Sequence, residues 1–227
     1  MGILPTMALQ AVLFDLDGTL IDSERDNIES VAMAMRKLGK TLTQVERDFI
    51  IGHSWRDIYD MLVRNHKIVM AMGDLINIAV DEKQSLIEAH GFNVLPGAID
   101  LVKRLFDRGI PLAIASGSSH REVHEAIEGI GLKPYFRVLL GAEDYPAGKP
   151  DPAPYKAAMK GLGVGPAGCV VIEDALPGVR SGKTAGAAVV GVQAGNFAKY
   201  DLSEAHLVVQ TLIDLDDAVF DHVLTLR

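Results

Sequence analysis

Short apolar runs alternate with amphipathic stretches along this chain. Six runs are apolar at nearly every position and end in small or acidic residues: 11–15, 111–116, 137–144, 169–174, 187–192 and 206–210. Such runs are typical of strands buried on both faces, as in a parallel sheet. The stretches 98–109 and 121–131 have helical spacing, and each ends in a glycine that suits a helix C-terminus. The alternation predicts an α/β fold with a doubly wound parallel sheet.

The interval between the first two predicted strands has a different pattern, with no convincing strand. It contains three amphipathic stretches: 26–39, 53–66 and 74–90. The second of these opens with Ser54 and, three residues later, Asp57, the spacing of a capping box. We therefore expect an all-helical cap domain at 21–94, inserted after the first strand of a Rossmann-like core domain formed by 1–20 and 95–227.

The composition is that of a folded acidic protein. Of the 227 residues, 48% are hydrophobic and 23% are charged, which excludes wholesale disorder. The formal net charge of −8 argues against a nucleic-acid or anionic-membrane partner. It would also repel a phosphorylated substrate, unless positive charge is concentrated at the binding site.

Cysteine content and hydropathy bear on location. Cys169 is the single cysteine, so neither an intramolecular disulfide nor a cysteine-based zinc site is possible, and we expect Cys169 to be inert core. The N-terminal segment has no basic region typical of a signal peptide, and no apolar run approaches a membrane span. We expect a cytoplasmic monomer that acts on a small molecule.

The carboxyl ends of the predicted strands carry the candidate chemistry, because ligands of open α/β sheets bind there. The first strand ends in Asp15-Leu16-Asp17-Gly18-Thr19. Two carboxylates that face one crevice repel each other by about 4 kcal/mol at 4 Å, and a cation relieves this. Hard oxygen ligands favour Mg²⁺. The alternative is an ordinary turn, for which Asp-Gly-Thr is also suitable.

Three further segments follow strands. Ser116 and Gly117 end the second strand, where a hydroxyl and free backbone N–H groups can hold an anion, whereas we expect Ser118 or Ser119 to cap the next helix. The backbone of Lys149 is fixed between Gly148 and Pro150. The remaining pair, Glu173-Asp174, offers either metal ligands or a helix cap.

Together these segments resemble the four motifs of the haloacid dehalogenase-like superfamily. They occur in the family's order as FDLDGTL (14–20), IASGSS (114–119), GKPDP (148–152) and VIEDALPGV (171–179). The helical insert is similar to the cap of the subgroup that contains β-phosphoglucomutase and sugar-phosphate phosphatases. The resemblance implies a Mg²⁺-dependent phosphatase of small phosphorylated metabolites, with sugar phosphates among the candidates.

The resemblance also implies roles for these residues. Asp15 would be the nucleophile, and Asp17 the general acid and then the general base. Mg²⁺ would be held by Asp15, by the backbone carbonyl of Asp17 and by Asp174, with Glu173 acting through water. The phosphoryl group would be bound by Ser116, Gly117 and Lys149, and Thr19 would orient the loop and complete the substrate site.

The main alternative within the superfamily is a phosphosugar mutase. The mutases carry an arginine in a Gly-x-Ser-Arg segment, but here Trp55 takes that place and Arg56 is displaced by one residue. They also tend to have a histidine where this chain has Asn27. We expect Trp55 and Arg56, with His53, to shape the substrate pocket, although Trp55 could instead pack within the cap. Dehalogenase and phosphonatase activities fit less well, and His120 and His124 are interpreted as surface residues.

Overall fold

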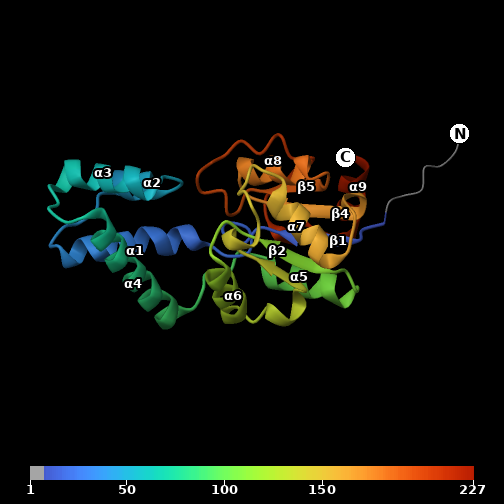
Figure 1. Ribbon diagram of the computed structural model, residues 1–227, viewed down its shortest axis with the longest axis horizontal. Coiled ribbons are helices and arrows are strands. Elements are labelled where there is room, and N and C mark those ends of the chain that lie inside the picture. The colour runs from blue at the N-terminus through green and yellow to red at the C-terminus, as the bar shows by residue number, and fades with distance from the viewer. Residues whose placement is uncertain (1–7) are drawn as a thin grey trace, which may run out of the picture. The chain divides into compact units, whose positions relative to one another are not determined.

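A sheet of six parallel strands forms the centre of the larger unit in the computed structural model, which describes residues 8–227 (Figure 1). The strands are β1 (Ala11–Phe14), β2 (Leu112–Ala115), β3 (Val138–Leu140), β4 (Cys169–Glu173), β5 (Ala188–Val192) and β6 (Leu207–Val209). Their order is β3-β2-β1-β4-β5-β6, with parallel pairing throughout. This topology confirms the predicted doubly wound α/β class, and it puts the reversal of strand order beside β1, where ligands of such sheets bind.

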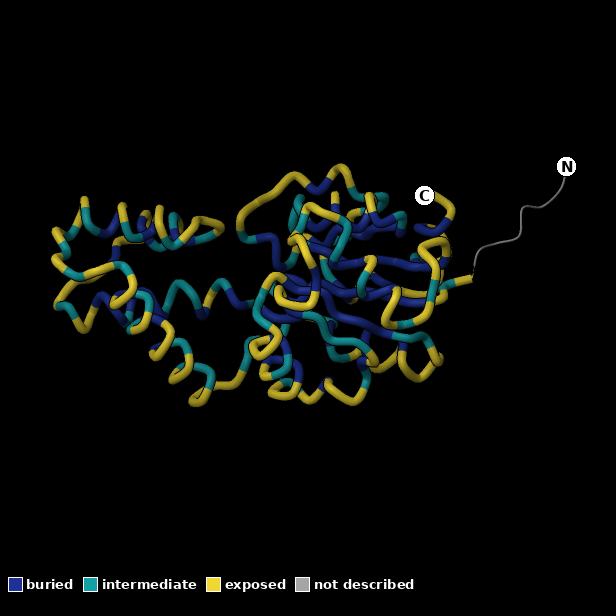
Figure 2. Tube along the Cα trace, viewed as in Figure 1, coloured by how far each residue is buried: buried dark blue, intermediate teal, exposed yellow. Residues whose placement is uncertain are grey.

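Burial distinguishes the central strands from the edges. Strands β1, β2, β4 and β5 are buried at every position, as their apolar runs predict (Figure 2). The edge strands β3 and β6 are only partly buried, so the prediction of burial on both faces is wrong for them. The run 137–144 also contains less strand than predicted, because β3 ends at Leu140 and a 3-10 helix, η2 (Ala142–Asp144), follows.

Helices and short 3-10 segments surround the sheet. The helices are α5 (Ala98–Asp107), α6 (His120–Gly129), α7 (Ala153–Leu162), α8 (Leu176–Thr184) and α9 (Asp217–Thr225). The other 3-10 segments are η1 (Lys133–Tyr135), η3 (Pro166–Gly168) and η4 (Leu212–Asp214). On one face, Tyr155 of α7 and Val179 of α8 pack with Leu13 and Val171 in a fully buried cluster. This packing brings α7 and α8 against the strands that end at the candidate site.

The second unit, Ser23–Phe92, is all helical. It consists of α1 (Ser23–Lys37), α2 (Gln44–Ile50), α3 (Trp55–His66) and α4 (Met72–His90), which share a core around Met35, Leu62 and Leu75. The sequence analysis missed α2, whose capping box joins Thr43 and Glu46. The predicted capping box at Ser54 is only half formed. The Asp57 amide donates to Ser54 Oγ, as predicted, but the Asp57 carboxylate accepts from the Ser54 hydroxyl instead of from the Ser54 backbone amide, because the aspartate side chain is short.

The chain leaves the larger unit at Asp22 and returns to it at Asn93. These crossings are neighbours: the amide of Asp22 donates to the carbonyl of Asn93 at 2.7 Å, and the amide of Leu95 donates to the carbonyl of Leu20 at 2.9 Å. The first seven residues of the predicted core domain, part of the segment in which no signal peptide is expected, lie outside the described residues. Within residues 8–227, no helix combines the length and hydropathy that a membrane span requires.

Candidate active site

Three adjacent strands bring the predicted residues to one edge of the sheet. Phe14, the last residue of β1, is in register with Ile114 of β2 on one side and Ile172 of β4 on the other. Asp15 follows β1 directly, Ser116 follows β2, and Glu173 ends β4 with Asp174 next. The candidate site therefore lies at the carboxyl ends of three adjacent, buried strands, β2, β1 and β4.

Asp15, Glu173 and Asp174 form a compact carboxylate group. One oxygen from each lies within 4.8 Å of the others, and Asp15 and Glu173 are buried. Burial raises the pKa of Asp15 to about 8, helped by the charge of Glu173 and opposed by Lys149. Burial, with the charges of Asp15 and Glu173, raises the pKa of Asp174 to about 9. This excess of negative charge and its hard oxygen donors fit a divalent cation such as Mg²⁺.

Lys149 supplies the positive charge within this group. Its Nζ lies 2.5 Å from Asp15 Oδ1 and 2.5 Å from Glu173 Oε1, and its side chain is 13% exposed. Burial opposes the charged form of Lys149, but the two carboxylates outweigh it and hold the lysine pKa well above its usual value. Local positive charge thus exists at this edge of an acidic protein, as binding of a phosphorylated substrate would require.

Glu173 is fixed from several sides. Tyr155 Oη donates to Glu173 Oε1 at 2.6 Å, and the Tyr155 ring centroid lies 5.0 Å from Lys149 Nζ. The backbone amide of Ala175 donates to Glu173 Oε2 at 3.3 Å. A side chain at Gly178 of α8 would overlap the Glu173 carboxylate, so only glycine fits there. The orientation of Lys149 therefore depends on α7 and α8 as well as on the strands.

Asp17 lies apart from the carboxylate group and is held by two serines. Ser118 Oγ donates to Asp17 Oδ2 at 2.7 Å, and Ser116 Oγ donates to the same oxygen at 3.2 Å. The helix cap is Ser119, which forms a capping box with Glu122. The prediction that Ser118 or Ser119 caps the next helix is therefore confirmed, with Ser119 in that role, because α6 begins one residue too late for Ser118 to reach its first amides.

Gly18 and Thr19 lie in the loop after β1, and each is constrained by its surroundings. Gly18 has a left-handed φ of 82°, and a side chain there would overlap the Asp174 carboxylate. Thr19 is fully buried, and its Oγ1 is the one buried polar side-chain atom of the described residues that lacks a hydrogen-bond partner. Gly117 is exposed, and a Cβ added to it would meet no atom within 4 Å outside its chain neighbours, so its backbone is accessible.

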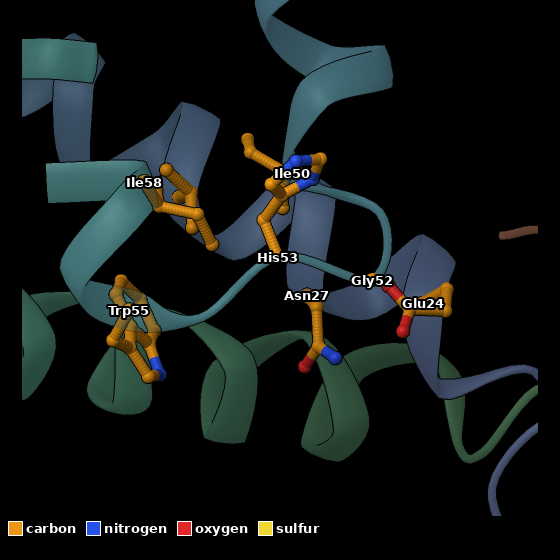
Figure 3. A pocket seen from close by; sticks show the side chains of 8 residues that line it. Glu24, Asn27, Ile50, Gly52, His53, Trp55 and Ile58 are labelled. Carbon is orange, nitrogen blue, oxygen red and sulfur yellow. The ribbon is translucent and has the colours of Figure 1, made fainter. Parts of the chain in front are cut away.

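Two of the three candidate residues of the helical unit, His53 and Trp55, line a cavity of about 130 Å³ (Figure 3). Trp55 lines the cavity, together with Glu24, Asn27, Val31, Ile50, Gly52, His53 and Ile58. Arg56 is exposed and is not part of this lining. The amide oxygen of Asn27 accepts a hydrogen bond from Lys83 Nζ at 2.8 Å. The cavity thus has an aliphatic wall and a rim of hydrogen-bonding groups and an indole.

The two histidines interpreted as surface residues, and Cys169, are not part of the carboxylate group. His120 and His124 stack with ring centroids 4.4 Å apart, and His120 Nδ1 lies 2.7 Å from Asp144 Oδ2. Within residues 8–227, these histidines belong to no group of three potential metal ligands. Cys169 is buried at the start of β4, and burial raises the pKa of its thiol to about 11. This agrees with a packing role for the cysteine.

The sequence analysis missed Tyr155 and the contact of Ser118 with Asp17. Tyr155 sits on the apolar face of α7, where an aromatic residue is interpreted as core. One signal was present for Ser118: it stands two residues beyond Ser116, in a loop that follows a strand end. Its contact with the aspartate is evident only once β1 and β2 are known to be neighbours.

Comparison with known proteins agrees with this geometry. The family model for haloacid dehalogenase-like hydrolases matches residues 12–192. Hexitol phosphatase A of Escherichia coli (strain K12) is 33% identical over 218 residues, which cover 91% of this chain and 93% of that protein. The bifunctional riboflavin kinase/FMN phosphatase of Arabidopsis thaliana is 31% identical over 212 residues, or 90% of this chain, but the match spans only 54% of that protein.

A solved structure extends the comparison. The crystal structure of a candidate beta-phosphoglucomutase from Thermotoga maritima has a TM-score of 0.79 at 26% identity, with 95% of this chain and 97% of that chain covered. The family match at residues 12–192 includes every strand end at which the charged residues gather. The chain therefore belongs to the haloacid dehalogenase-like hydrolases.

Proposed function

We propose that this protein is a Mg²⁺-dependent phosphatase that hydrolyses small phosphorylated metabolites through an aspartyl-phosphate intermediate. The observation that carries the proposal is the pairing of Asp15 with Lys149 inside a group of three carboxylates. A nucleophilic carboxylate that attacks a dianionic phosphate needs positive charge beside it, and this site supplies a lysine and a donor set for a cation. The phosphatases among the relatives support hydrolysis of a phosphoric monoester.

The first step transfers the phosphoryl group to Asp15. A carboxylate oxygen of Asp15 forms a bond to phosphorus while the bond from phosphorus to the alcohol oxygen breaks. The leaving oxygen takes a proton from Asp17, so an alcohol departs rather than an alkoxide. In the second step Asp17 takes a proton from water, the resulting hydroxide attacks phosphorus, and Asp15 is released together with inorganic phosphate.

The other core residues hold the transferring group. Lys149 and Ser116 donate to the phosphoryl oxygens, together with the accessible backbone at Gly117. Thr19 offers a buried hydroxyl that has no other partner. Asp15, Asp174 and the backbone carbonyl of Asp17 would hold Mg²⁺, and Glu173 would act through water. Bound Mg²⁺ supplies charge neutralisation for the transferring phosphoryl oxygens.

The cavity of the helical unit is our candidate for recognition of the rest of the substrate. Its indole and aliphatic groups suit the carbon skeleton of a sugar or polyol, and the Asn27 amide and Glu24 carboxylate suit hydroxyl groups (Figure 3). The similarity to a hexitol phosphatase supports the same class of substrate. Within this proposal Trp55 is a binding residue, whereas Arg56 is exposed and does not line the cavity.

A phosphosugar mutase of the β-phosphoglucomutase type is the second candidate, favoured by the structural similarity to such a protein. A mutase must hold a second phosphate while it reorients its intermediate. Arg56, the nearest arginine in sequence to the expected position, does not line the cavity, and none of the residues that line it is a lysine or an arginine. These observations favour the phosphatase.

Phosphate release from a panel of phosphorylated compounds tests the proposal. The panel contains sorbitol 6-phosphate, glucose 6-phosphate, 2-phosphoglycolate, FMN, p-nitrophenyl phosphate and β-glucose 1-phosphate, each with Mg²⁺ or with excess chelator. We expect Mg²⁺-dependent release that is lost in Asp15→Asn and retained in Asp221→Asn, a matched change at an exposed carboxylate. Conversion of β-glucose 1-phosphate to glucose 6-phosphate without release would establish the mutase instead. Full activity of pure Asp15→Asn would refute both.

A further inference from the structure

We propose that Ser118 is a positioning residue. It holds the Asp17 carboxylate while Ser116 donates its hydrogen bond to the phosphoryl group. The inference rests on the proposed function. It starts from an asymmetry in the hydrogen bonds that Asp17 accepts. Both serines donate to Asp17 Oδ2, but the Ser118 bond is 2.7 Å and the Ser116 bond is 3.2 Å.

The chemistry of a hydroxyl group makes these two bonds inequivalent during catalysis. A serine has one proton to donate, although its oxygen can accept as well. Ser116 is almost fully buried, and its Oγ already accepts the backbone N–H of Ser118 at 3.1 Å. When Ser116 donates its proton to a phosphoryl oxygen, it can no longer donate to Asp17. Ser118 then provides the remaining hydrogen bond to Oδ2.

The backbone of Ser118 is held in place, and its hydroxyl has no competing role. Its own amide is bound to Ser116 Oγ, and its carbonyl accepts the amide of Ala142 at 2.9 Å, so its backbone is fixed on both sides. The capping of α6, which would otherwise compete for a serine hydroxyl in this loop, is performed by Ser119. The Ser118 hydroxyl is therefore committed to Asp17.

The consequence concerns the proton that Asp17 delivers. With Oδ2 engaged by Ser118, the proton for the leaving oxygen is carried on Oδ1, and the carboxyl plane is held in one orientation. As the phosphorus–oxygen bond breaks, this proton passes from Oδ1 to the departing alcohol oxygen. Loss of Ser118 leaves Asp17 free to rotate, so proton delivery suffers while attack by Asp15 does not.

This separation gives a test that depends on the leaving group. An alkyl phosphate needs protonation of its leaving oxygen, whereas p-nitrophenyl phosphate releases a stable anion. The ratio kcat/KM reports the steps up to release of the alcohol, and it therefore isolates proton donation from later hydrolysis of the intermediate. We would measure it for both substrates, with sorbitol 6-phosphate, or the best alkyl phosphate of the panel, as the first.

For Ser118→Ala we expect kcat/KM to fall about tenfold on the alkyl phosphate, the size of effect expected for one lost hydrogen bond to a protonated carboxyl group. On p-nitrophenyl phosphate we expect a change of less than about twofold. Ser118→Thr, which keeps the hydroxyl, should restore most of the loss. Ser119→Ala is the matched control: it removes the neighbouring hydroxyl and a helix cap, lowers the melting temperature and leaves the ratio between the two substrates unchanged.

Two results would overturn the inference: an equal loss on both substrates, which would mean that Ser118 acts on the phosphoryl group, or no loss on either. Asp17→Asn provides the reference, because it should show the same preference for the aryl substrate more strongly. If Asp17→Asn shows that preference and Ser118→Ala does not, the inference fails while the proposed function stands. Failure of the function itself would appear as full activity in Asp15→Asn.

Discussion

Gly178→Ala tests whether the packing of α8 against Glu173 keeps the candidate active site in place. Gly178 itself has no side chain that could take part in the reaction. A helical glycine replaced by alanine usually gains about 0.5–1 kcal/mol of stability. Here the new Cβ would lie well inside 3.0 Å of the Glu173 carboxyl carbon and both of its oxygens. The Glu173 carboxylate must therefore move away from α8. This movement would disturb its hydrogen bonds with Lys149 at 2.5 Å and with Tyr155 at 2.6 Å.

Two costs set the expected magnitude. Overpacking of a filled interior costs about 1–3 kcal/mol, which exceeds the gain in helix propensity. With that gain subtracted, a net loss of about 1 kcal/mol remains, which lowers the melting temperature of a chain of this size by about 2–4 °C. A displacement of about 1 Å in a group that positions the reacting atoms can reduce the rate about 100-fold. We therefore expect a folded protein with a modestly lower melting temperature and a much lower kcat.

The assay is turnover of the best substrate of the panel, with thermal unfolding measured on the same preparation. Gly73→Ala is the matched control, since it also lies in a helix and its new Cβ would meet no heavy atom within 4 Å. Gly73→Ala should keep its activity and have an unchanged or slightly raised melting temperature, because it gains helix propensity without a clash. If Gly178→Ala retains kcat within about threefold and is no less stable, then Glu173 is not packed against α8 in the way described, and the reasoning fails.

Three other changes probe the same site. Tyr155→Phe keeps the buried ring but removes the donor to Glu173, so kcat should fall about tenfold with little change in KM; an unchanged kcat would show that Lys149 needs no help from α7. Because the pKa values of Asp15 and Asp174 are raised to about 8 and 9, the folded state holds protons that the unfolded state loses above about pH 4. The melting temperature of chelator-treated protein should therefore fall as pH rises from 5 to 8, and a rise over that range would contradict the described burial of the carboxylates. Added Mg²⁺ should raise the melting temperature most at pH 8, where the carboxylates are most ionised, and Asp174→Asn should reduce that effect.

The sequence predicts the central sheet and the charged strand ends because both leave local signals. An apolar run marks each central strand, and the residues after it are polar whatever the strand order. The partial burial of β3 and β6 could not be predicted, since it depends on their position at the edges of the sheet. Helix α2 has only seven residues, too few for a clear period, although Thr43 and Glu46 mark its start.

The supporting contacts of the site are harder to predict for a different reason. Ser118 and Ser119 have the same intrinsic tendency to cap a helix, and a shift of one residue in the start of α6 decides which of them does so. Tyr155 satisfies the apolar pattern of α7 whether or not its hydroxyl finds a partner. Such contacts join residues that are distant in sequence, so they depend on the packing of α7 and the loop after β2 rather than on any local pattern.

The neighbouring crossings at Asp22 and Asn93 have a consequence for how this protein can evolve and be engineered. Because the chain departs and returns at adjacent backbone positions, a segment whose own two ends lie close together can be grafted between them without stretching β1 or β2. Chimaeras that exchange Ser23–Phe92 for the corresponding segment of a relative should thus retain the sheet. Recombination of whole modules would then change the helical unit, while the strand ends that carry Asp15, Ser116 and Asp174 are inherited intact.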